Sequence, residues 1–134
     1  MPKASVLLDT NIISELMRPR PDVGVLAWAD RENECLLSAI SVDELAFGLA
    51  WRPNQRIADF FAAFVALHTV LPVTEEIARR AGQLRGTFRS HGIARSQPDM
   101  LIAATAQVHA LTLVTRNTGD FSGCGIPILN PFST

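Results

Sequence analysis

The chain has 134 residues, a mass of 14.6 kDa and 48% apolar residues, which fits one globular domain and excludes a disordered chain. Its 12 basic residues nearly balance 13 acidic residues, so the net charge of −1 excludes binding of nucleic acid by bulk positive charge alone. The two cysteines have no disulfide-type or zinc-type spacing, and the apolar stretches are far shorter than the roughly 20 residues of a membrane span. We therefore expect a cytoplasmic protein with no membrane contact.

Short apolar runs alternate with helical patterns along the chain. The first half predicts a buried strand over 5–8, helices over about 11–18 and 21–32, a strand over 35–38, and helices over 41–51 and 54–68. The second half predicts a strand over 70–73, a helix from its N-cap Thr74 to about Ser90, a loop over 91–97, a helix from Pro98 to Ala110, and strands over 111–115 and 126–129. Strands that alternate with helices predict one α/β domain over residues 1–134, with a mainly parallel sheet of about five strands flanked by helices.

Two acidic residues follow predicted strands. Asp9 comes directly after Val6-Leu7-Leu8, and Asp120 lies in the loop after the strand over 111–115. Ligands of open α/β sheets bind at the carboxyl ends of the strands, so the two carboxylates can meet there. Taken singly, each is more simply explained as a turn or capping residue.

Asp99 opens a helix in which its neighbours along one face are Ile102, Ala103 and Ala106. Small side chains allow close approach of another element, so this face is expected to be buried. The alternative is that an acid in the first turn only complements the helix dipole.

Glu44 allows two interpretations. Ser41 and Glu44 fit a capping box, with Ile40 and Leu45 placed as a hydrophobic staple. Glu44 also lies on one helix face with Phe47, Gly48 and Trp51. Because glycine inside a helix costs about 1 kcal/mol relative to alanine, Gly48 indicates that space is needed one turn from the carboxylate.

Several carboxylates at one end of a sheet repel one another unless a cation lies among them. Mg²⁺ and Mn²⁺ take oxygen ligands, and they suit phosphodiester hydrolysis because the metal generates the nucleophile and stabilises the leaving oxygen.

Four blocks of the chain, in order and at normal spacing, resemble PIN-domain ribonucleases, in particular the toxins of the VapC and FitB type in VapBC toxin–antitoxin pairs. The blocks are Leu7-Leu8-Asp9-Thr10-Asn11, residues 37–48, residues 98–106 and residues 113–121. The ending Ile128-Leu129-Asn130-Pro131-Phe132 also resembles the FitB-like branch. The similarity covers nearly the whole chain.

The resemblance implies a catalytic acid set of Asp9, Glu44, Asp99 and Asp120. Asp9, Asp99 and Asp120 would ligate Mg²⁺, or Mn²⁺ in its place, and Glu44 would ligate through water or position the nucleophile. Some relatives carry the fourth acid at the position of Asn117, and Asp120 is favoured here. The implied supporting residues are Thr10, Asn11, Thr115 and Asn117.

The implied function is a Mg²⁺-dependent endoribonuclease that acts as the toxin of a type II toxin–antitoxin pair. The implied partners are a cognate antitoxin, an RNA substrate and a second copy of the chain, with operator DNA reached only through the antitoxin. The alternatives are a catalytically weak PIN module that mainly binds an antitoxin in a DNA-bound repressor complex, and a Mg²⁺ phosphohydrolase with an aspartyl nucleophile. The DxDxT spacing of the latter is absent, because Asp9 is followed by Thr10-Asn11.

Arg85 and Arg89 are four residues apart on the predicted helix that follows Thr74, so they project from one face. A solvated helix face is the default explanation. The functional alternative is that they steer RNA phosphates towards the acidic site.

Overall fold

The computed structural model describes residues 5–31 and 33–133. In this part of the chain, the strands are β1 (Ser5–Leu8), β2 (Glu34–Ser38), β3 (Thr69–Leu71), β4 (Thr112–Val114) and β5 (Ile128–Leu129). The helices are α1 (Thr10–Leu16), α2 (Val23–Ala29), α3 (Ala39–Trp51), α4 (Gln55–Leu67), α5 (Glu75–Ser90) and α6 (Gln97–Val108), and a 3-10 turn, η1, spans Thr118–Phe121. The predicted α/β class is confirmed.

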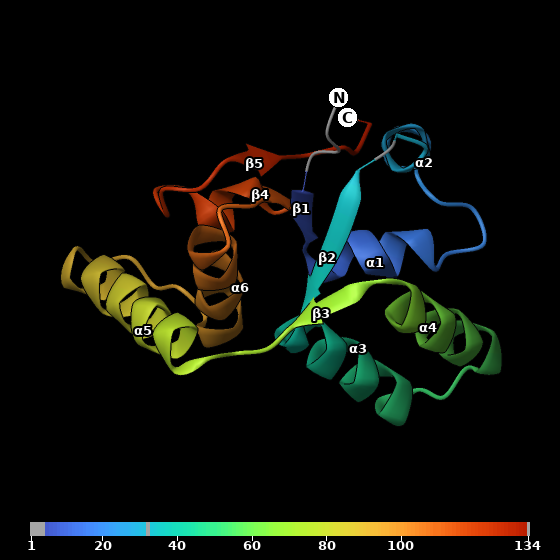
Figure 1. The fold of residues 1–134 in the computed structure, drawn as a ribbon, viewed down its shortest axis with the longest axis horizontal. Helices are drawn as coiled ribbons and strands as arrows, with labels where there is room; N and C mark the ends of the chain where they lie inside the picture. Colours follow the sequence, from blue (N-terminus) through green and yellow to red (C-terminus); the bar gives the residue numbers. More distant parts are fainter. Residues whose placement is uncertain (1–4, 32, 134) are drawn as a thin grey trace.

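The strands form one parallel sheet in the order β3-β2-β1-β4-β5 (Figure 1). The central strand β1 pairs with β2 through Leu7 and Leu36 and with β4 through Leu7 and Leu113. The chain first adds β2 and β3 on one side of β1 and then β4 and β5 on the other. This reversal makes the carboxyl ends of β1 and β4 the topological switch point, where ligands of such sheets bind.

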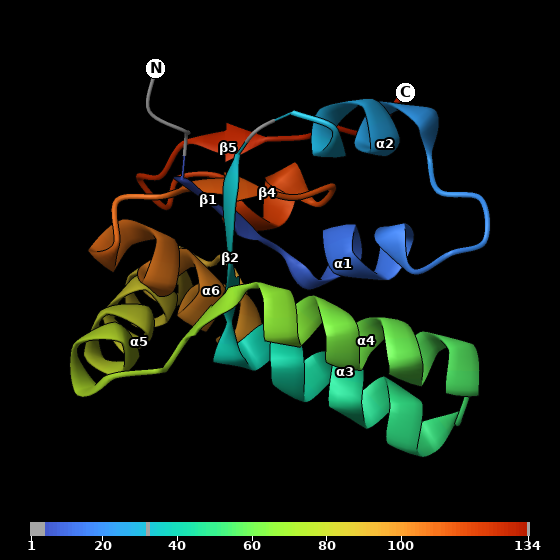
Figure 2. The ribbon, with the colours of Figure 1, turned by 45° about the vertical axis from the view of Figure 1, so that its right-hand side comes forward.

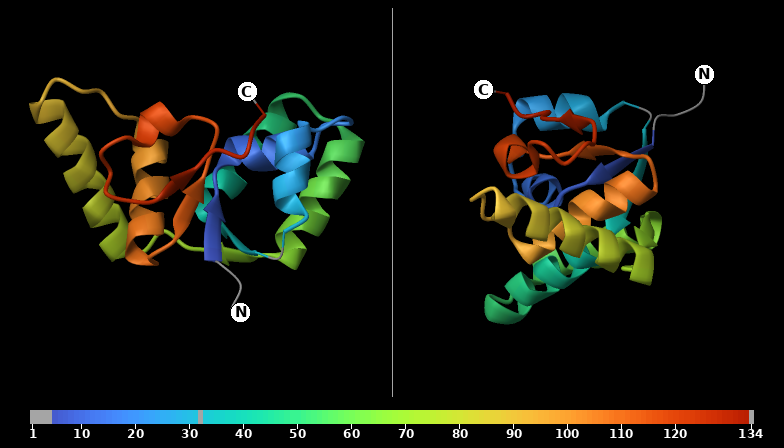
Figure 3. Two further views of the ribbon diagram at one scale, coloured as in Figure 1. Left: turned by 90° about the horizontal axis from the view of Figure 1, so that it is seen from above. Right: turned by 90° about the vertical axis from the view of Figure 1, so that its left-hand side faces the viewer.

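Helices cover both faces of the sheet (Figure 3). Leu7 joins the core formed with α5 and α6, which includes Met100, whereas Val6 and Leu8 join the core on the α1 side, which includes Ile12. Successive side chains of a strand point to opposite faces, so an uninterrupted apolar run suits a strand with a core on each side. The predicted buried stripe of α6 is confirmed, because Ile102, Ala103 and Ala106 are fully buried.

Two helices, α2 and α3, begin two residues away from their predicted starts. The predicted start of α2 at Pro21 is wrong, because the Asp22 carboxylate accepts from the backbone N–H groups of Gly24 and Val25 and so forms the N-cap. The predicted capping box at Ser41 is also wrong. The hydroxyl oxygen of Ser38, at the end of β2, accepts from the backbone N–H of Ile40 at 3.0 Å and caps α3.

The C-terminal segment lies against the first turn of α2 (Figure 2). The backbone N–H of Ser133 donates to Asp22 Oδ1 at 2.9 Å, and the Ser133 hydroxyl donates to the other carboxylate oxygen. These donors lower the pKa of Asp22 to about 2. Gly24 permits the approach, because a Cβ there would lie 2.5 Å from the backbone oxygen of Pro131.

The hairpin of α3 and α4 leaves much of its apolar surface exposed. In α3 only Ser41 is buried, although apolar side chains lie along the helix. Phe47 is 64% exposed and Trp51 69% exposed, whereas Trp28 of α2 is buried. Among residues 5–31 and 33–133, no helix has the length and apolar character needed to cross a membrane.

Candidate active site

Three of the four predicted acids face one cavity at the switch point of the sheet. Asp9 follows β1 directly, Glu44 comes from α3, and Asp99 lies in the first turn of α6. The cavity has a volume of about 330 Å³, and it is lined by Asp9, Thr10, Asn11, Ser14, Glu44, Asp99 and Asn117. Residues from four separate parts of the chain therefore converge at the edge where β1 and β4 end.

The carboxylate of Asp9 is held by hydrogen bonds from the first residues of α1 and from Thr115 at the end of β4. Its Oδ1 accepts from the backbone N–H of Thr10 at 2.8 Å. Its Oδ2 accepts from the Thr115 hydroxyl at 2.8 Å and from the Asn11 amide at 3.1 Å. The Thr115 oxygen in turn accepts from the backbone N–H of Asn117 at 3.0 Å. Of the four predicted supporting residues, Thr10, Asn11 and Thr115 bond Asp9 directly, and Asn117 bonds Thr115.

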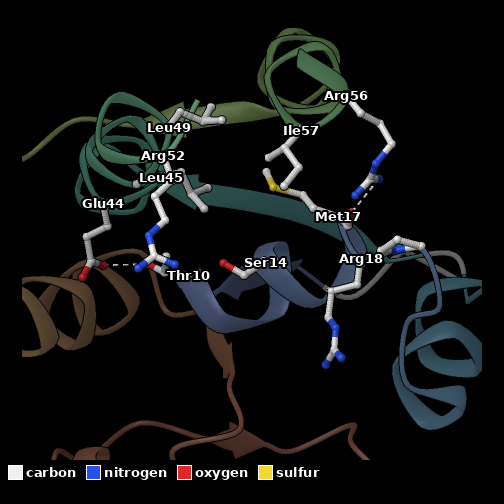
Figure 4. Close-up of a pocket in the computed structure, with 12 residues that line it drawn as sticks. Thr10, Ser14, Met17, Arg18, Glu44, Leu45, Leu49, Arg52, Arg56 and Ile57 are labelled. Carbon is white, nitrogen blue, oxygen red and sulfur yellow. Dashed lines mark hydrogen bonds between the residues drawn. The ribbon is translucent and has the colours of Figure 1, made fainter. Parts of the chain in front are cut away.

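A second set of hydrogen bonds orients Glu44. The Thr10 hydroxyl donates to Glu44 Oε1 at 2.7 Å (Figure 4). The same hydroxyl lies 2.9 Å from the Ser41 hydroxyl. Because Ser38 caps α3, Ser41 and Glu44 both lie inside the helix and face α1. Sequence reasoning missed Ser41 as a site residue, since its spacing to Glu44 was explained by the capping box.

The site is electrostatically suited to a cation. Asp9 is only 5% exposed, and this burial raises its pKa, an effect opposed by the hydrogen bond from Thr115 and reinforced by the charges of Asp99 and Glu44. Burial also raises the pKa of Asp99, with further increases from Asp120 and Glu44. Because each carboxylate disfavours ionisation of its neighbours, a bound cation would relieve this repulsion.

Asp120 and Asn117 occupy different places. Asp120 is exposed in η1, near enough to raise the pKa of Asp99, but it does not line the cavity, whereas Asn117 does. Arg95 holds η1 in position: its guanidinium donates to the backbone oxygens of Gly119 at 3.1 Å and Ser122 at 2.8 Å. Sequence analysis did not assign this role to Arg95.

Ser96 is a further residue that sequence reasoning missed. Its hydroxyl oxygen accepts from the backbone N–H of Asp99 at 3.1 Å and so caps α6, and its side chain also lowers the pKa of Asp99. The Ser96-x-x-Asp99 spacing before an apolar run is a capping signal that could have identified it.

The predicted RNA-contacting arginines lie apart from the acids. Arg85 and Arg89 are exposed on α5, and neither lines the acidic cavity. Arg85 instead lines a separate cavity between α5 and α6. Arg79 and Arg80, on the same helix, form ion pairs with Glu75 and Glu76 one turn earlier.

The donor set fits a hard divalent cation that keeps part of its water shell. Within residues 5–31 and 33–133, no three His, Cys, Asp or Glu side chains form a compact ligand cluster. The carboxylates of Asp9, Glu44 and Asp99 instead surround a cavity with room for water. Mg²⁺ is commonly bound in this way, through one or two carboxylates and several waters, because it dehydrates reluctantly.

These features define an α/β domain with an acidic site at the switch point of a parallel sheet. The PIN domain family matches residues 6–123. The chain belongs to the PIN-domain family, in its branch of FitB and VapC toxins.

Two relatives and two solved structures show how far the similarity extends. Toxin FitB of Neisseria gonorrhoeae is 38% identical, and VapC ribonuclease Y4jK of Sinorhizobium fredii is 36% identical; each alignment covers 95% of this chain and at least 97% of the relative. The crystal structure of FitAcB from Neisseria gonorrhoeae matches with a TM-score of 0.84 and 37% identity over 94% of this chain and 97% of that one. FitAB bound to the IR36 DNA fragment matches with a TM-score of 0.79 and 35% identity over 96% of both chains.

Proposed function

We propose that this protein is a metal-dependent endoribonuclease that acts as the toxin of a type II toxin–antitoxin pair. The observation that carries the proposal is the convergence of Asp9, Glu44 and Asp99 on one cavity at the switch point of a PIN fold. The similarity to a VapC ribonuclease supports RNA as the substrate.

In this proposal Asp9, Asp99 and Asp120 hold Mg²⁺ or Mn²⁺. When bound, the metal supplies a Lewis acid for the phosphate and a water of lowered pKa. Thr115 keeps Asp9 pointing into the cavity, and Thr10 fixes Glu44 where it can accept a proton from the attacking water. Asp120 would act from the rim, since its charge already influences Asp99.

Asp120 and Asn117 can be distinguished by titration with metal. We expect Asp120→Asn to weaken Mg²⁺ binding more than Asn117→Ala does, because a carboxylate contributes charge as well as an oxygen ligand. The reverse order would assign the fourth position to Asn117.

We further propose that Arg85 and Arg89 steer RNA towards the site by long-range attraction, since they do not line the acidic cavity. Charge reversal of both should slow cleavage more at low salt than at high salt. Equal effects at the two salt concentrations would contradict this role.

The proposed partners are a cognate antitoxin, through which the toxin reaches operator DNA, and a second copy of the chain. The exposed apolar side chains of α3, including Phe47 and Trp51, support a protein partner on this hairpin. The similar FitAB structure is bound to a DNA fragment, which supports a DNA-bound complex.

The same exposed surface favours the second candidate, a weak PIN module that mainly binds an antitoxin. RNA cleavage by antitoxin-free protein separates the two. We expect cleavage with Mg²⁺ that is abolished by EDTA and by Asp9→Asn or Asp99→Asn. Expression of the chain without its cognate antitoxin should arrest growth of the host cells, and the Asp99→Asn substitution should restore growth. Cleavage that persists unchanged in both Asp variants would contradict the proposed function.

A further inference from the structure

A second cavity adjoins the acidic one. This side cavity lies between α1 and the α3–α4 hairpin and has a volume of about 410 Å³ (Figure 4). Thr10, Ser14 and Glu44 line both cavities, so the two share a wall. The volume lies in the range of roughly 300–1,000 Å³ that is typical of small-ligand sites. A chain bound across the acidic site could therefore place its next unit in the side cavity.

The floor of the side cavity is apolar. Met17 of the segment after α1, Leu45 and Leu49 of α3, and Ile57 of α4 all line it (Figure 4). A planar nucleobase can pack between aliphatic side chains of this kind. The residues that line this cavity include neither Asn nor Gln, so it offers no side-chain amide that could hydrogen-bond the edge of a base.

The same cavity is lined by three arginines and one carboxylate. Arg18 forms an ion pair with Glu15 at 3.3 Å. Arg56 donates to the backbone oxygen of Met17 at 2.9 Å, a neutral acceptor that leaves its charge uncompensated. No ion pair among the described residues involves Arg52 or Arg56. Two guanidinium groups are thus available to phosphate, for which their planar donors are well suited.

Gly48 leaves space in the side cavity. A Cβ placed on Gly48 would meet nothing within 4 Å, so the packing of this chain does not require glycine there. Glycine is nevertheless unfavourable inside a helix. The space is therefore available to an occupant that the chain itself does not supply.

We propose that the side cavity binds a nucleotide adjacent to the scissile phosphate, with its base on the apolar floor and its phosphates on Arg52 and Arg56. The inference rests on the proposed ribonuclease function and deepens it. RNA is favoured over an apolar peptide because the cationic groups outnumber the single carboxylate, Glu44, at the shared wall. The aliphatic floor offers no hydrogen-bonding group to a base, so we expect the subsite to add affinity with little sequence preference.

The first test measures RNA binding by the full chain freed of antitoxin. The probe is a fluorescein-labelled, mixed-sequence single-stranded RNA of about 12 nucleotides, in EDTA to prevent cleavage. We expect Arg52→Glu to weaken binding roughly tenfold and to reduce the salt slope by about 0.7 for each lost phosphate contact. Arg31→Glu, in the turn after α2 and outside both cavities, makes the same charge change and should have a much smaller effect.

The second test fills the cavity without changing charge. Gly48→Leu should weaken RNA binding several-fold, while Gly48→Ala should leave it near that of the unmodified protein. Gly48→Ala should melt at or above the temperature of the unmodified protein, because its Cβ enters open space. The melting temperature of Gly48→Leu is measured alongside, so that a loss of RNA binding can be separated from a loss of folding. In cleavage assays with metal, Arg52→Glu should raise KM and leave kcat nearly unchanged, since it removes binding that is equal in ground and transition states.

Three outcomes are decisive. Unchanged RNA affinity and KM in both Arg52→Glu and Gly48→Leu, in a protein that cleaves RNA, overturn the subsite alone. If these two variants lose binding to the cognate antitoxin but keep their RNA affinity, the cavity belongs to the protein partner, and the proposed subsite is overturned as well. Unmodified protein that neither binds nor cleaves RNA contradicts the proposed function itself.

Discussion

Thr115 is fully buried behind Asp9, and its hydroxyl oxygen takes part in three hydrogen bonds. Thr115→Val keeps the shape but leaves Asp9, Asn11 and Asn117 each without this partner. We expect a loss of about 1–3 kcal/mol in the free energy of unfolding, measured by urea denaturation at neutral pH. Thr115→Ser keeps the hydroxyl and should lose much less.

The effect of Thr115→Val should depend on pH. The Thr115 hydroxyl lowers the pKa of Asp9, which burial raises, so it stabilises the ionised carboxylate. Its contribution is therefore largest above the raised pKa of folded Asp9 and declines as the carboxyl becomes protonated at lower pH. A difference between the Val and Ser variants that stays constant down to acid pH would contradict this role.

Asp99 is expected to couple stability to divalent metal. The raised pKa values of Asp9 and Asp99 mean that the folded protein holds these protons more tightly than the unfolded chain, whose Asp value is 3.8. Without metal, ionisation of the two groups lowers stability as the pH rises through their folded pKa values. Bound Mg²⁺ reverses this penalty, and at 100 times its dissociation constant it would add about 2.7 kcal/mol.

We therefore expect Mg²⁺ to raise the melting temperature at neutral pH. As the pH is lowered, this increase should begin to shrink before the pH reaches 3.8, because protons compete with Mg²⁺ for two carboxylates whose pKa values are raised above 3.8. Asp99→Asn should reduce the increase, whereas Asp30→Asn, at the exposed end of α2, should not. An equal rise in melting temperature with Mg²⁺ in the unmodified protein, Asp99→Asn and Asp30→Asn would exclude Asp99 as a ligand.

The starts of the helices show where capping residues near in sequence are enough to predict a boundary and where they are not. Thr74 and the acids after it mark the start of α5 correctly, because a cap depends on residues within one turn. At α3, both Ser38 and Ser41 could serve as caps. The choice depends on where β2 stops pairing with β3, at Ser38, and this is a contact between distant segments.

The contact of the C-terminal segment with α2 can be tested through glycine. In Gly24→Ala the new Cβ would meet backbone atoms of Pro131 and Ser133 at 2.5 and 2.6 Å, so the segment must shift. We expect a lower urea midpoint and loss of the hydrogen bonds to Asp22. Gly48→Ala, which meets nothing, should instead stabilise α3 by roughly 0.5–1 kcal/mol. Equal effects of the two variants would contradict this packing.

The exposed pair on α3 is expected to contact one of the two proposed protein partners; if that partner is the second copy of the chain, the pair lies in the homodimer interface. Phe47 and Trp51 lie with ring centroids 5.9 Å apart, and both are more exposed than buried. Replacement of both by serine should convert a dimer to a monomer in light scattering while leaving the far-ultraviolet circular dichroism unchanged. Leu67→Ser, at a position 80% exposed on α4, should remain dimeric. A dimeric double variant would exclude this face.

The sequence by itself determined the α/β class and most of the capping, and it predicted the three acids that line the cavity. These features depend on apolar periodicity and on side chains near one another in the chain, or on blocks shared with a family. The exposure of Trp51 shows where such signals stop: a helical pattern shows that a face is apolar but not what covers it.

Only the tertiary structure decided which groups share a cavity. Thr10 meets Glu44 across 34 positions, and Thr115 meets Asp9 across 106. No signal in the sequence singled out Arg52 and Arg56, yet they line the cavity beside the acids. Arg85 and Arg89 lie on α5, away from that cavity. Such contacts follow from the order of the strands and the docking of the helices, and local spacing carries no information about either.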